Sequence, residues 1–90
     1  MTRTYEVPTA EGMIAWLTGA VARYAERPEA EIDPDAPLSD YGLDSVAAFA
    51  VITEIEDAFD VLPDVTVVWD YPSIRKLASF LTDLIRSERE

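Results

Sequence analysis

The fold of this chain is constrained most strongly by its apolar residues. They recur at helical spacing, in segments that prolines divide. They recur every three or four positions in three segments, as on the buried face of an amphipathic helix. The pattern predicts helices from about Thr9 to Glu26, from about Asp44 to Phe59, and from Ser73 onward. The expected buried faces are Met13, Ile14, Leu17, Ala20, Val21 and Tyr24, then Ala48, Val51, Ile52, Ile55 and Phe59, then Ile74, Leu77, Ala78, Leu81, Leu84 and Ile85.

The segments between these helices predict the rest of an all-α four-helix bundle. Pro28, Pro34 and Pro37 prevent a continuous helix over residues 27–43 and predict a long first loop. Residues 66–70 are long enough for one short helical turn, which becomes the third helix. Ile32, Leu38 and Leu43 are the apolar residues expected to anchor the loop. We expect residues 1–90 to form one domain with frayed tails at 1–8 and 86–90.

The composition lacks the residue types that most catalytic sites use. The chain of 90 residues has no cysteine and no histidine. It therefore lacks thiolate and imidazole ligands for a metal, and it cannot form a Ser-His-Asp triad. We expect a protein that is not an enzyme and that holds no metal.

The charge of the chain indicates which partners it avoids. Eighteen acidic and seven basic residues give a net charge of −11. Such a charge repels nucleic acid and anionic membranes and favours proteins with lysine and arginine patches. No apolar run approaches the roughly 20 residues of a membrane span, and no apolar signal region follows Arg3. These features predict a cytoplasmic protein.

Ser45 is the candidate site residue, in the run Tyr41-Gly42-Leu43-Asp44-Ser45-Val46. Gly42 suits a tight or left-handed turn, and Asp44 is a strong N-cap type for the second helix. Ser45 then falls at the first helical position with its hydroxyl outward. A phosphate on that oxygen would lie at the positive end of the helix dipole. Capping alone also accounts for an Asp-Ser pair at a helix start.

In these residues the chain resembles the acyl carrier protein family, from about Thr9 to Ile85. The element Gly42-Leu43-Asp44-Ser45 matches that family's Gly-x-Asp-Ser, and the loop from Ile32 to Leu43 is similar to its long first loop. The resemblance implies that Ser45 receives 4′-phosphopantetheine from coenzyme A. A phosphopantetheinyl transferase would attach it, and Asp44 would help hold that enzyme's magnesium.

The resemblance also implies that partner enzymes meet the exposed side of the second helix. We expect this surface to include Val46, Ala47, Ala50, Glu54 and Asp57, apolar near Ser45 and acidic further along. The expected partners are an acyltransferase or another acyl- or aminoacyl-loading enzyme and downstream synthase domains, acting on a monomer. Tyr41, Phe49, Trp16 and Trp69 are expected in the core rather than around an acyl-chain pocket.

The leading interpretation is a discrete acyl carrier protein of polyketide or related secondary metabolism. Asp44 before the serine favours acyl cargo over peptidyl cargo, in which His-Ser or Gly-Ser pairs are common. An aminoacyl or peptidyl carrier of a nonribosomal pathway is the alternative. A further alternative is an unmodified acidic interaction module that binds a basic partner through the second helix.

Overall fold

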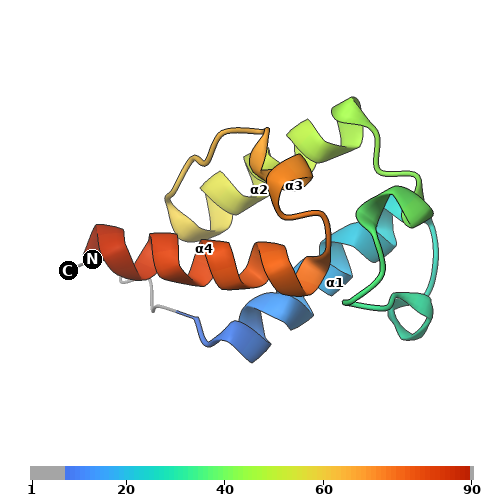
Figure 1. Ribbon diagram of the computed structural model, residues 1–90, viewed down its shortest axis with the longest axis horizontal. Helices are drawn as coiled ribbons and strands as arrows, with labels where there is room; N and C mark the ends of the chain where they lie inside the picture. The colour runs from blue at the N-terminus through green and yellow to red at the C-terminus, as the bar shows by residue number, and fades with distance from the viewer. Residues whose placement is uncertain (1–7, 90) are drawn as a thin grey trace.

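Four α-helices make up the protein, which we describe over residues 8–89 of a computed structural model (Figure 1). They are α1 (Ala10–Ala25), α2 (Ser45–Phe59), the short α3 (Val67–Asp70) and α4 (Ile74–Arg89). The predicted all-α class with three long helices and one short third helix is confirmed. Within the described residues, no helix combines the length and apolar character needed to cross a membrane.

One hydrophobic core lies between the three long helices, and α4 packs most extensively along α1. Its largest fully buried side chains are Met13, Leu17, Val21, Val51, Ile55, Ile74, Leu81 and Ile85. These belong to the predicted buried faces, which are therefore largely confirmed. Tyr24 is the exception, because it is 41% exposed. It lies in the last turn of α1, where the phenol remains at the surface beside Glu54.

Side-chain caps fix where the long helices begin. The Thr9 hydroxyl accepts a hydrogen bond from the Gly12 N–H at 2.9 Å, and the Asp44 carboxylate accepts one from the Ala47 N–H at 2.9 Å. The Ser73 hydroxyl accepts one from the Lys76 N–H at 3.2 Å. Each bond satisfies an N–H group that has no partner within its own helix. The predicted starts at Thr9, Asp44 and Ser73 are confirmed.

The last helix, α4, continues through Arg89 and so includes residues 86–89 of the predicted frayed tail. The fraying itself stays a prediction. Glutamate and arginine are good helix formers and no glycine or proline interrupts this turn. Asp83 and Arg86 also form an (i, i+3) ion pair at 3.6 Å. The predicted frayed tail at 1–8 lies outside the described residues except for Pro8, as does Glu90.

The long first loop contains two short 3₁₀ turns that the sequence pattern did not predict. They are η1 (Glu29–Glu31) and η2 (Leu38–Tyr41). Ile32 and Leu38 are buried and Leu43 is half-buried, so the predicted apolar anchors are confirmed. In Figure 1 the loop closes the end of the bundle where α1 ends and α2 begins.

Polar contacts fasten this loop to the start of α4. The Leu38 N–H donates to the Pro72 carbonyl at 2.8 Å, and the Arg75 N–H donates to the Pro34 carbonyl at 3.0 Å. The Arg75 side chain donates to the Asp35 carboxylate at 2.6 Å. We call these contacts the loop clamp. They hold a long irregular segment against a helix that follows it much later in the sequence.

Candidate functional site

The backbone before Ser45 is shaped by one glycine and one cap. Gly42 has φ of 72°, a left-handed conformation that costs other residues strain, and its N–H donates to the Ser39 carbonyl at 3.1 Å. Asp44 is extended and caps α2. Ser45 is the first residue of α2 and is exposed. The predicted geometry of Gly42, Asp44 and Ser45 is thus confirmed.

The surroundings of Ser45 leave room for a substituent and offer little to hold a free phosphate. The start of α2 supplies the positive end of a helix dipole, and the exposed serine leaves room for a substituent. Yet residues 28–74 contain no lysine or arginine, so the segment around the site supplies no cation. Asp44 adds a negative charge beside the site. A free anion gains little here, whereas an ester bond would hold one regardless.

The predicted partner surface on α2 is partly exposed, and its role in binding stays a prediction. Val46 and Asp57 are exposed as expected, but Ala47, Ala50 and Glu54 are half-buried. All three remain partly exposed, and Glu54 pairs with Arg23 of α1 at 2.6 Å.

Two aromatic residues expected in the core are exposed instead. Phe49 is 64% exposed and Trp69 is 53% exposed, whereas Trp16 and Tyr41 pack partly buried against the core. Phe49 was missed because an aromatic residue in an apolar segment predicts burial. The available signal was its spacing, since a residue four positions after Ser45 lies on the same face of the helix.

Glu54 has a structural role between α1 and α2. Its carboxylate accepts a hydrogen bond from the Arg23 guanidinium. Hydrogen bonding to the same carboxylate, with partial burial and the negative charge of Glu54, raises the pKa of Tyr24. The acid therefore joins α2 to the end of α1, and it is less available to a partner than the exposed acids further along α2.

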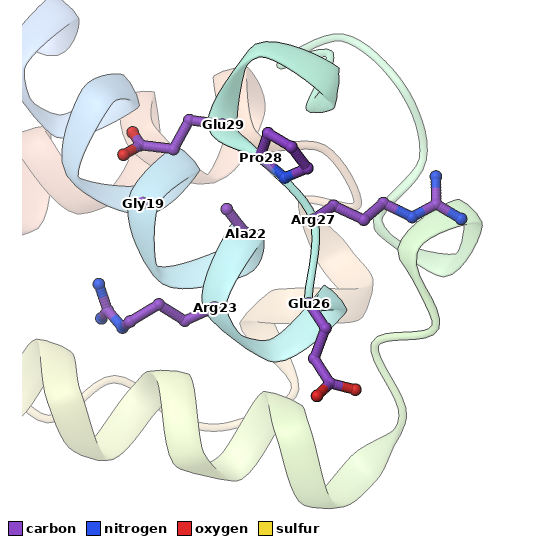
Figure 2. A pocket seen from close by; sticks show the side chains of 7 residues that line it. All are labelled: Gly19, Ala22, Arg23, Glu26, Arg27, Pro28 and Glu29. Atoms are coloured by element: carbon purple, nitrogen blue, oxygen red, sulfur yellow. The ribbon is translucent and has the colours of Figure 1, made fainter.

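An open hollow lies where α1 ends and η1 begins, and its lining includes no residue of α2. Figure 2 shows its lining residues, which are Gly19, Ala22, Arg23, Glu26, Arg27, Pro28 and Glu29. It mixes two arginines with two glutamates, and Arg23 is already paired with Glu54. Arg27 points away from Gly19 (Figure 2). Across residues 8–89, no group of three or more acidic side chains is arranged to hold a metal ion.

Comparison with known proteins finds similarity over most of the chain. The family described as phosphopantetheine attachment site matches residues 15–81. The chain is 36% identical over 76 residues to polyketide synthase PksL of Bacillus subtilis, covering 84% of this chain and 2% of that protein. It is 35% identical over 65 residues to a phenolphthiocerol/phthiocerol polyketide synthase of Mycobacterium tuberculosis, covering 72% of this chain and 4% of that protein. The chain thus spans only a few per cent of the length of these relatives.

Solved structures share the fold over nearly their whole length. A free-standing peptidyl carrier protein from Acinetobacter baumannii has a TM-score of 0.81 at 33% identity, covering 84% of this chain and 95% of that one. The acyl carrier protein LipD from Actinoplanes friuliensis has a TM-score of 0.73 at 38% identity, covering 97% of this chain and 98% of that one.

Proposed function

Because the chain belongs to the phosphopantetheine-attachment family of carrier proteins, we propose that Ser45 bears the 4′-phosphopantetheine group. Members of this family carry the group and are not themselves catalysts. The observation that supports Ser45 is its exposed position at the start of α2, inside the matched residues. When bound, the group supplies a terminal thiol, on which acyl cargo travels as a thioester. This chain has no cysteine or histidine with which to act on such cargo.

Asp44 is proposed to act twice. It caps α2 through the Ala47 N–H, which fixes the backbone on which Ser45 is presented. Its carboxylate would also help the phosphopantetheinyl transferase hold magnesium during attachment. The variant Asp44→Ser keeps a capping oxygen but loses the charge. We expect it to unfold at nearly the wild-type denaturant concentration and to be modified more slowly.

The proposed setting is polyketide or related biosynthesis in the cytoplasm, with residues 8–89 acting as one carrier domain. The polyketide synthases that the chain resembles support acyl cargo. The peptidyl carrier among the similar structures keeps aminoacyl cargo as the alternative. The proposed partners are the transferase, an acyltransferase or another acyl- or aminoacyl-loading enzyme, and downstream synthase domains.

The test is incubation with coenzyme A, magnesium and a broad-specificity phosphopantetheinyl transferase, followed by intact and peptide mass measurement. We expect one phosphopantetheine on the peptide that contains Ser45 and none in Ser45→Ala. Ser39→Ala is the matched control, because Ser39 is an exposed serine in η2 whose loss should leave the addition intact. A folded wild-type protein that gains no mass would favour the unmodified acidic interaction module.

Cargo is tested next on the modified protein. Transfer from acyl-coenzyme A by an acyltransferase would support an acyl carrier. Loading only by an enzyme that activates amino acids as adenylates would establish the aminoacyl alternative.

A further inference from the structure

One ion pair joins α1 to α2. The Arg23 guanidinium donates to the Glu54 Oε1 atom at 2.6 Å, and no other ion pair links these two helices among the described residues. The Tyr24 hydroxyl lies beside the same carboxylate. We call Arg23 and Glu54 the α1–α2 latch. The charged link between the two helices therefore depends on a single guanidinium.

The latch satisfies only half of the Glu54 carboxylate. The second oxygen, Oε2, is buried and receives no hydrogen bond from the residues that the structure describes. A buried charged oxygen without a partner costs free energy, because it has given up water and gained nothing in return. The Arg23 side chain, by contrast, is 61% exposed and keeps most of its water. The closed latch therefore carries a penalty that solvent would remove on reaching Oε2.

Apolar packing holds the start of α2 weakly. Within residues 45–50 only Ala48 is fully buried, and burying its methyl group stabilises far less than burying a larger side chain. The larger buried side chains of α2 begin at Val51. At the far end Phe59 makes an edge-to-face contact with Trp16 of α1, with ring centroids 5.1 Å apart. A tilt of α2 about this aromatic contact would therefore move its start the most.

We propose that α2 has two positions against α1: a closed one that the latch holds, and an open one in which water solvates both latch side chains and the start of α2, with Ser45, is displaced. The unpartnered Oε2 keeps the two positions close in free energy, because the closed position never satisfies the whole carboxylate. The inference concerns the helix itself and does not require Ser45 to be modified.

The geometry of the latch gives the size of the movement. Lengthening the 2.6 Å contact beyond hydrogen-bond range takes about 1 to 2 Å at Glu54. Glu54 lies five residues from Phe59 and Val46 lies thirteen, so a tilt about Phe59 moves Val46 roughly two to three times as far. We therefore expect the open position to displace Val46 by about 3 to 5 Å.

Double electron–electron resonance can measure this movement, because the chain has no cysteine and two can be introduced to carry spin labels. Val46→Cys and Ser79→Cys place the labels at exposed positions of α2 and α4. We expect two distances between the labels in otherwise wild-type protein. Arg23→Met keeps an apolar stem but leaves the carboxylate without its cation. It should raise the ratio of open to closed protein about two- to fivefold.

Glu54→Met distinguishes a latch from a plain brace. Methionine fills nearly the same space without a buried oxygen, and Arg23 stays hydrated when its partner is lost. This variant should therefore lower the ratio of open to closed protein below that of the wild type. Arg86→Met is the matched control, because it removes a guanidinium of similar exposure that pairs with Asp83 within α4. It should leave the ratio unchanged.

Three results would overturn the inference. One distance in the wild type that persists in Arg23→Met would mean that α2 has a single position. A higher open share in both Arg23→Met and Glu54→Met would identify the pair as a brace. A longer distance that appears only with loss of the far-UV circular dichroism of helix would identify unfolding instead. None of these results depends on modification of Ser45, so the proposed function stands or falls by its own test.

Discussion

Replacing Thr82 by valine should stabilise the protein. Thr82 is 4% exposed on α4, and its hydroxyl oxygen has no hydrogen-bond partner among the described residues. A buried polar group without a partner costs about 1 to 3 kcal/mol of folding free energy, because it gives up water and gains nothing in return. Valine has nearly the same shape and a similar helix propensity. The variant Thr82→Val should therefore raise the free energy of unfolding by about 1 kcal/mol or more.

Two measurements give the size of the effect. In urea, where the slope is about 1 kcal/mol per molar for a small domain, the midpoint should rise by about 1 M. In a thermal scan, Tm should rise by about 4 to 8 °C for each kcal/mol in a domain of this size.

Thr18 provides the control for Thr82. Its hydroxyl donates to the Ile14 carbonyl at 2.7 Å, so Thr18→Val loses a hydrogen bond and should lower stability by about 0.5 to 1.5 kcal/mol. A fall in stability for Thr82→Val would refute the reasoning, because it would mean that the buried hydroxyl is bonded in solution. An equal rise in both variants would also refute it, since valine would then stabilise either site irrespective of the hydroxyl's partner.

Three further predictions concern backbone and charge. Gly42→Ala should lower the free energy of unfolding by about 1 kcal/mol in urea, because φ of 72° strains any side chain; an unchanged midpoint would contradict this. Gly19→Ala should raise it by about 0.5 to 1 kcal/mol, because the added methyl meets nothing closer than 3.7 Å and alanine favours the helix interior; a lower midpoint would contradict it. The Arg75 guanidinium lowers the pKa of Asp35. This ion pair should therefore contribute to the free energy of unfolding near neutral pH, and its contribution should be lost as pH falls below about 4. The difference in free energy of unfolding between wild type and Asp35→Asn should therefore become smaller at acidic pH. A difference that grows would contradict the stabilising pairing of Arg75 with ionised Asp35.

The sequence predicts those parts of the fold that depend on neighbouring residues. Helical spacing identified Met13 and Leu17 as core, and capping chemistry located the starts of α2 and α4 at Asp44 and Ser73. Each of these signals acts within one or two turns of the chain. The loop clamp could not be found in this way, because Arg75 becomes a partner of Asp35 only once α4 has packed onto α1.

The candidate site likewise combines features that neighbouring residues determine with features that packing determines. The presentation of Ser45 is local and was predicted from its own turn. The exposure of Phe49 was not, because an apolar pattern does not tell how wide a face of α2 its neighbours cover. Ala50 and Glu54 were expected on the exposed side of α2, but both are half-buried, and Glu54 reaches Arg23 of α1.

The loop clamp also sets an order of events during synthesis. A ribosome adds Ser45 well before Pro72 and Arg75, yet those two residues hold the loop that leads to Ser45. While the nascent chain lacks α4, the loop has neither its carbonyl partner nor its guanidinium partner. The part of the loop from Pro34 to Leu38 can therefore take its final form only after nearly the whole domain has been synthesised, whereas the turn that presents Ser45 depends only on its own neighbours.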